Sequence, residues 1–99
     1  MSIALIWSPE AKSTLTQNMG YLAEEWDDQV LRQFLNQVET ALQKIQQYPQ
    51  SYPLYKATPN IRMFKINKRI VLYYKIVSDI RIELITFWNT YRNPDDLKI

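Results

Sequence analysis

Apolar residues follow a helical spacing in the first half of the chain. After a short apolar run at residues 3–7, which predicts a strand, Ser8 and Pro9 form a helix start with a hydroxyl N-cap and a proline at the first helical position. Asp27 and Asp28 can cap a second helix. Spacings of three and four residues predict the two apolar faces. The first consists of Ala11, Leu15, Met19, Leu22 and Trp26, and the second of Leu31, Phe34, Leu35, Val38, Ala41, Leu42 and Ile45.

After residue 60 the apolar residues alternate, which predicts three strands. The even positions are apolar: Phe64, Ile66, Ile70, Leu72, Tyr74, Ile76, Ile80, Ile82, Leu84 and Trp88. Even residues of neighbouring antiparallel strands share a face only if each loop has an odd number of residues, so we predict three-residue loops at 67–69 and 77–79. The even face should cover the helices. The odd face mixes apolar and charged residues and should be open.

The predicted element order is β-α-α-β-β-β, a single α+β domain over residues 1–99. In this fold a helix hairpin packs on one face of a largely antiparallel sheet. No apolar run approaches the ~18–20 residues of a membrane span, and the first residues lack the features of a signal peptide. We therefore expect a cytoplasmic protein without membrane contact.

Composition restricts the chemistry. The chain has no cysteine and no histidine, which excludes a disulfide framework, a thiol nucleophile and the usual general base near neutral pH. Carboxylates alone are weak zinc ligands, so we expect neither a metal site nor a cofactor. Charge is uneven: residues 1–50 carry three basic and six acidic side chains, whereas residues 51–99 carry nine basic and four acidic ones. Such asymmetry indicates a polyanionic or acidic protein partner.

Several segments occur together along the whole chain in a characteristic order and spacing. They are Trp7-Ser8-Pro9-Glu10-Ala11, the acidic hinge 24–28, Ile61-Arg62-Met63-Phe64, the strand 69–76 and the ending Phe87-Trp88-Asn89-Thr90-Tyr91-Arg92-Asn93-Pro94. In this arrangement the chain resembles the RelE/ParE superfamily of toxins from type II toxin–antitoxin modules. The ending is similar to that of the ParE-like branch.

The resemblance implies a small toxin that is neutralised by a cognate antitoxin. ParE-like members inhibit DNA gyrase, whereas RelE-like members cleave messenger RNA in the ribosomal A site with basic residues on the central strands and near the C-terminus. This chain has Val71, Asn89 and Leu97 where the nucleases carry functional residues. We therefore favour a gyrase inhibitor. A ribosome-dependent mRNA endoribonuclease and an inactive relic that only binds antitoxin remain as alternatives.

For the nuclease alternative, cationic side chains would stabilise the phosphorane, and the candidate catalytic residues are Lys65, Lys75, Arg81 and Arg92. The proton acceptor would be Glu83, Tyr91, or one of Lys65 and Lys75, which could lower each other's pKa if they lie close together on neighbouring strands; otherwise they are two solvated lysines on an exposed face.

The candidate binding residues are Arg62, Arg69, Tyr73, Phe87, Asn89 and Tyr91. Tyr73 and Phe87 lie on the predicted open face, where they could stack on bases, although aromatic residues in strands more often serve packing or contact a bound partner. We also expect an acidic segment of the antitoxin to cover this face, because soluble monomers rarely expose such an apolar patch.

Overall fold

Both helices start where the sequence predicts. The computed structural model describes residues 3–25 and 27–99. Helix α1 (Pro9–Glu25) follows Ser8, whose hydroxyl oxygen accepts the Ala11 N–H at 2.9 Å. Helix α2 (Asp28–Gln47) follows Asp27, whose carboxylate accepts the Val30 N–H at 3.1 Å. These bonds satisfy backbone donors that the first turn of a helix leaves free. Trp26, the last residue of the first predicted stripe, lies outside the described residues.

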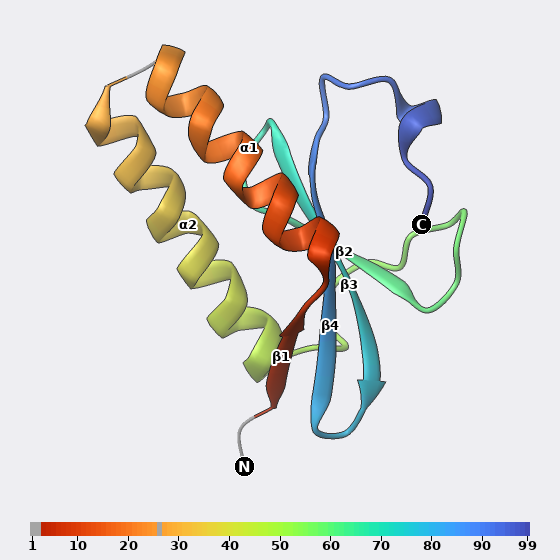
Figure 1. Cartoon of the computed structure of the whole chain (residues 1–99). Helices are drawn as coiled ribbons and strands as arrows, with labels where there is room; N and C mark the ends of the chain where they lie inside the picture. The colour runs from red at the N-terminus through yellow and green to blue at the C-terminus, as the bar shows by residue number, and fades with distance from the viewer. Residues whose placement is uncertain (1–2, 26) are drawn as a thin grey trace.

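A four-stranded sheet in the order β1-β4-β3-β2 carries the helices on one face (Figure 1). Strand β1 (Ala4–Trp7) runs parallel to β4 (Arg81–Asn89), and β3 (Ile70–Ser78) runs antiparallel to both β4 and β2 (Ile61–Lys65). The predicted α+β class, element order and largely antiparallel sheet are therefore confirmed. None of the described helices is long and apolar enough to cross a membrane.

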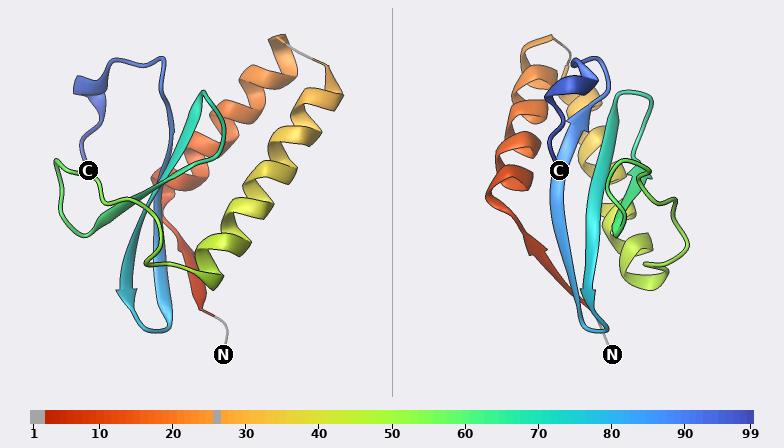
Figure 2. Two further views of the ribbon diagram at one scale, coloured as in Figure 1. Left: turned by 180° about the vertical axis from the view of Figure 1, so that it is seen from behind. Right: turned by 90° about the vertical axis from the view of Figure 1, so that its right-hand side faces the viewer.

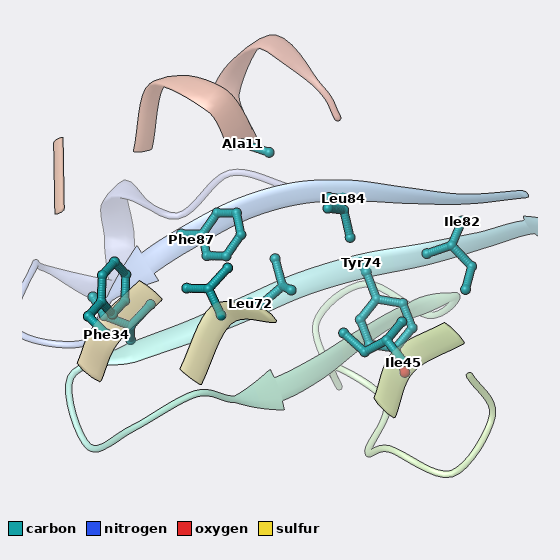
Figure 3. Close-up of a cluster of buried hydrophobic side chains, with 10 residues drawn as sticks. Ala11, Phe34, Ile45, Leu72, Tyr74, Ile82, Leu84 and Phe87 are labelled. Atoms are coloured by element: carbon teal, nitrogen blue, oxygen red, sulfur yellow. The ribbon is translucent and has the colours of Figure 1, made fainter. Parts of the chain in front are cut away.

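The helix face of the sheet holds the main core, but the predicted alternation fails near the end of β4. Tyr73 pairs with Thr86 and Tyr74 pairs with Leu84, so Ile85 is an extra residue that forms a β-bulge. A bulge shifts the residues beyond it to the opposite face. As a result Phe87, which we expected on the open face, lies in the main core beside Leu72 (Figure 3).

Trp88 correspondingly leaves the predicted even face and lies on the opposite side of the sheet. Phe87 is 1% exposed, and its ring stacks on Trp7 with the ring centroids 5.6 Å apart. The remaining even-face prediction holds for Leu72, Tyr74 and Leu84, which are buried in the main core.

Polar side chains of α1 and of its N-cap residue Ser8 stabilise this bulged part of β4. Strand β1 ends at Trp7, so the outer edge of β4 beyond Leu84 has no strand beside it. The Ser8 hydroxyl donates to the Ile85 carbonyl at 2.8 Å. The Thr14 hydroxyl oxygen accepts the Phe87 N–H at 2.9 Å, and the Asn18 amide donates to the Phe87 carbonyl at 3.1 Å. The helix thus supplies the hydrogen bonds that a neighbouring strand would otherwise make.

We expect Thr14→Val to lower the free energy of unfolding by about 1–3 kcal/mol, because it leaves the buried Phe87 N–H without an acceptor. Thr16→Val is the matched control, since the Thr16 hydroxyl is exposed and donates only to Lys12 of its own helix. Urea denaturation of both variants measures the difference. Equal losses would contradict the role of α1 as a substitute strand.

The face opposite the helices is covered by the chain itself, so the prediction of an open odd face is wrong for much of its area. Figures 1 and 2 show the segment before β2 and the C-terminal tail on this side of the sheet. A second cluster consists of the buried Ile61, Tyr73 and Trp88 with the partly buried Tyr55, Met63, Val71, Ile85, Leu97 and Ile99. The Thr58 hydroxyl donates to the backbone oxygen of Ile99 at 2.6 Å, which ties the tail to the preceding loop.

The two predicted loops have different outcomes. At 67–69 the Ile66 N–H donates to the Ile70 carbonyl at 3.0 Å, which closes the predicted turn. The prediction at 77–79 is wrong, because Ser78 pairs with Arg81 and the turn contains only two residues. Ile80, predicted to face the helices, lies in this turn and is 54% exposed.

Candidate functional site

Cationic and aromatic side chains gather where β3 begins and β4 ends. The guanidinium carbon of Arg69 lies 4.8 Å from the ring centroid of Tyr91 and 5.6 Å from that of Tyr21. Tyr21 belongs to α1, Arg69 precedes β3 and Tyr91 follows β4. Three distant segments of the sequence therefore contribute to one cluster, which we call the Arg69–tyrosine cluster.

Local hydrogen bonds fix the segments that carry this cluster. The Asn67 side-chain oxygen accepts the Arg69 N–H at 2.8 Å. The Arg69 carbonyl accepts the Thr90 N–H at 2.7 Å. The Asn89 side-chain oxygen accepts the Tyr91 N–H at 2.9 Å. Asn89, a predicted binding residue, thus shapes the turn that presents Tyr91.

A hollow of about 420 Å³ adjoins the cluster. Leu22 of α1 and Val30 of α2 contribute apolar side chains to its wall, and the other lining residues are Asn67, Lys68, Arg69 and Tyr91. The hollow therefore combines an apolar part with two cationic side chains, and no acidic side chain lines it among the residues that the structure describes. At the tip of the β2–β3 hairpin, the side-chain amide of Asn67 donates to the side-chain oxygen of Gln37 in α2 at 3.0 Å, which holds the tip against the helices beside the hollow.

Two of the four candidate catalytic residues lie toward this end of the sheet. Lys65 pairs with Val71, and Val71 pairs with Trp88. The guanidinium carbon of Arg92 lies 4.4 Å from the centroid of a Trp88 ring. Lys65 of β2 and the Trp88 ring of β4, over which Arg92 lies, are therefore in register across β3.

The other two candidate catalytic residues lie toward the opposite end. Lys75 pairs with Ile61 and Glu83, four residues along β3 from Val71, which corresponds to about 13 Å. Arg81 pairs with Ser78 at the β3–β4 turn, farther still along the sheet. The expectation of a closely spaced Lys65–Lys75 pair is therefore wrong, since the register separates the two positions. Lys75 instead faces Glu83, which gives an opposite-charge cross-strand pair.

Two predicted base-stacking residues are inaccessible. Phe87 is buried in the main core and Tyr73 is 7% exposed in the second cluster. The ring of Tyr73 packs edge-on against Tyr55, with the centroids 5.1 Å apart. Burial, together with the nearby Tyr55 hydroxyl, raises the pKa of Tyr73, so its phenol stays neutral near pH 7. Both residues contribute to packing, the more common role of aromatic residues in strands, and neither ring is accessible for stacking on bases.

Arg62 and Tyr74 both hold the loop that follows α2. The Arg62 guanidinium donates to the carbonyls of Gln50 at 3.1 Å and Tyr52 at 2.8 Å. The Tyr74 hydroxyl donates to the Pro49 carbonyl at 2.7 Å, and burial raises the pKa of Tyr74 to about 12. Arg62, a predicted binding residue, is therefore occupied in anchoring the connection to β2.

The sequence does not point to Tyr21 or Leu22 as members of a site. Leu22 belongs to the predicted apolar stripe of the first helix. For Tyr21 the sequence offers one signal, a large aromatic residue off that stripe, and the structure shows that it is 46% exposed. Among residues 3–25 and 27–99, no group of three or more acidic side chains is placed to hold a metal ion.

The comparison with protein families identifies the chain. The model for the ParE toxin of type II toxin–antitoxin systems, of the parDE type, matches residues 5–94. The chain belongs to the ParE toxin family. The predicted membership of the RelE/ParE superfamily is confirmed, and with it the assignment as a toxin of a type II toxin–antitoxin module.

Solved structures share the fold of this ParE family member. A chain of the chromosomal ParDE toxin–antitoxin system from P. aeruginosa superposes with a TM-score of 0.73 at 11% identity, covering 88% of this chain and 95% of that one. A YoeB/ParE toxin from Agrobacterium tumefaciens gives 0.65 at 14% identity, with coverages of 90% and 100%. A YoeB dimer from Staphylococcus aureus gives 0.61 at 16% identity, with coverages of 90% and 98%. No curated protein matches the sequence.

Proposed function

We propose that this ParE-family toxin acts in the cytoplasm as an inhibitor of DNA gyrase and that a cognate antitoxin neutralises it. The observation that carries the choice of target is the separation of the candidate catalytic residues. Lys65 and Arg92 lie toward one end of the sheet, and Lys75 and Arg81 lie toward the other.

Metal-independent RNA cleavage needs a proton acceptor and cationic groups that converge on one phosphate. Lys65 and Lys75 are separated at the backbone by about 13 Å along β3, and Arg81 lies farther still. Charged groups of both ends would meet on one phosphate only if their long side chains extended toward each other along the sheet. Glu83 faces Lys75, and Tyr91 contacts Arg69 at the other end of the sheet. This distribution supports a binding role for the cationic residues over acid–base catalysis.

Charge supports an acidic antitoxin as partner, because the second half of the chain carries nine basic and four acidic residues. Similar solved structures include the ParDE system and a heterotetrameric YoeB–YefM toxin–antitoxin complex from Staphylococcus aureus. These complexes provide an analogy for the assembly proposed for this chain.

A supercoiling assay tests the target directly. The purified toxin is expected to suppress ATP-dependent supercoiling by DNA gyrase at least tenfold, and the same toxin premixed with antitoxin should leave supercoiling intact. In induced cells, we expect filamentation and DNA damage while translation at first continues. Primer extension on messages from these cells is expected to show no cleavage at ribosome-occupied codons.

Codon-phased cleavage that disappears in the Lys65→Ala/Arg92→Ala double variant would replace the gyrase proposal with the endoribonuclease alternative. If the chain binds antitoxin but affects neither gyrase nor messages, it is an inactive relic. Circular dichroism of the double variant checks that the fold is retained, so that a loss of activity reports on the removed charges.

A further inference from the structure

The Arg69–tyrosine cluster holds an arginine in a form suited to binding. The guanidinium carbon lies 4.8 Å from the ring centroid of Tyr91 and 5.6 Å from that of Tyr21, so two aromatic rings lie beside a planar group that carries five N–H donors. The turn at Asn67 and the hydrogen bond from Thr90 fix the backbone that carries the side chain. An arginine restrained in this way loses less conformational entropy when it binds an anion.

The hollow next to Arg69 indicates what kind of anion it accepts. Leu22 and Val30 provide an apolar surface, and Lys68 adds a second positive charge. An occupant that matches both parts carries an acidic group beside an apolar side chain. Arginine and tyrosine beside an open apolar hollow are also residue types that are enriched among those that dominate the binding energy of protein interfaces.

The surroundings favour a protein segment over a nucleic acid. Asp27 lies beside the hollow, because its carboxylate accepts the N–H of Val30, one of the lining residues. A continuous phosphodiester backbone would bring negative charges toward this carboxylate. A peptide can place an acidic side chain at Arg69 and a neutral residue near Asp27. It is therefore complementary both to the positive charge at Arg69 and to the negative charge at Asp27.

We propose that Arg69 binds a carboxylate of an acidic antitoxin segment, and that the apolar residue next to this carboxylate fills the hollow over Leu22 and Val30. The inference rests on the proposed neutralisation by an antitoxin and assigns the surface where it occurs. This surface lies at the helix side of the β2–β3 turn, and differs from the odd sheet face on which the sequence placed the antitoxin.

Calorimetric titration of toxin variants with the antitoxin encoded beside the toxin gene tests this assignment. Arg69→Gln is expected to weaken binding at least tenfold. Arg69→Lys, which keeps the charge but loses the planar fork, should fall between Arg69→Gln and the wild type. Lys12→Gln removes one exposed charge from α1 outside the hollow, and is expected to change the affinity less than twofold. Leu22→Ser should also weaken binding by reducing the apolar surface.

A double-mutant cycle identifies the bound carboxylate. Each aspartate and glutamate of the antitoxin is changed to its amide and titrated against both wild-type toxin and Arg69→Gln. One antitoxin position should show a large effect with the wild type and little further effect with Arg69→Gln. Circular dichroism verifies that each toxin variant is folded, and Arg69→Lys keeps the test valid if Arg69→Gln does not fold.

Failure of this inference differs from failure of the proposed function. If the wild-type toxin does not bind the antitoxin, the proposed neutralisation is wrong. If the wild type and Arg69→Gln bind the antitoxin equally well, the assignment of the surface is overturned while the neutralisation stands. If Arg69→Gln instead loses affinity for single-stranded RNA or DNA oligonucleotides and keeps its affinity for antitoxin, the cluster is a nucleic-acid site.

Discussion

Phe87→Ala is expected to lower the free energy of unfolding by about 3–5 kcal/mol, the range typical of a large-to-small change in a core. Phe87 is 1% exposed, stacks on Trp7 and lies beside Leu72 in the main core (Figure 3). The variant would remove the aromatic contact and leave a cavity between α1 and the sheet. Chemical denaturation followed by circular dichroism measures the loss.

Tyr48→Ala is the matched control for Phe87→Ala, because Tyr48 is an aromatic residue that is 60% exposed. Its expected effect is about 0.5 kcal/mol or less. The strict alternation of the sequence makes the opposite prediction, with Phe87 on an open face and a small loss there. A loss at Phe87 no greater than that at Tyr48 would therefore contradict the bulge at Ile85.

Trp88→Ala is expected to destabilise the protein by about 3–5 kcal/mol and to release the C-terminal tail as well. Trp88 is buried in the second cluster, against which Leu97 and Ile99 pack. Amide hydrogen exchange should therefore accelerate in the short 3-10 helix Pro94–Asp96 and the residues after it. A mass shift in peptides from this region measures the effect separately from global stability.

Arg92→Ala is the control for Trp88→Ala, because it removes the positive charge over the Trp88 ring and leaves the packing of the tail on Trp88 in place. Arg92 lies over the Trp88 ring, and an exposed cation–π contact contributes about 0.5–1 kcal/mol. This variant is expected to leave the exchange of the tail nearly unchanged. Unchanged exchange in Trp88→Ala would show that the tail is held by other contacts, such as the Thr58–Ile99 hydrogen bond.

Residue types and their parity predict only part of the site. The sequence names Arg69 and Tyr91 as candidate binding residues, and the structure brings these two side chains into contact. It also grouped Lys65 with Lys75, because both occupy odd positions on neighbouring strands. Parity specifies the face of a sheet but not the position along a strand, and the register separates these two lysines by four residues of β3. Tyr21 was missed because its contact with Arg69 depends on how α1 packs against the β2–β3 turn.

The sequence by itself determined the elements and the fold class of this protein. Capping side chains at Ser8 and Asp27 act within one helical turn, and the apolar spacing reflects the period of each element. Such signals are local, so they can be interpreted without knowing what the element packs against.

Only the tertiary structure decided which face Phe87 and Trp88 occupy and what covers the second face of the sheet. The bulge at Ile85 is stabilised because Ser8, at the N-cap of α1, and Thr14 and Asn18 within α1 bind the backbone of β4, about 70 residues later in the chain. These contacts depend on the position of α1 in the folded protein, which alternation along a strand cannot encode. The Arg69–tyrosine cluster has the same origin, since its three side chains meet only when helix, turn and tail have packed together.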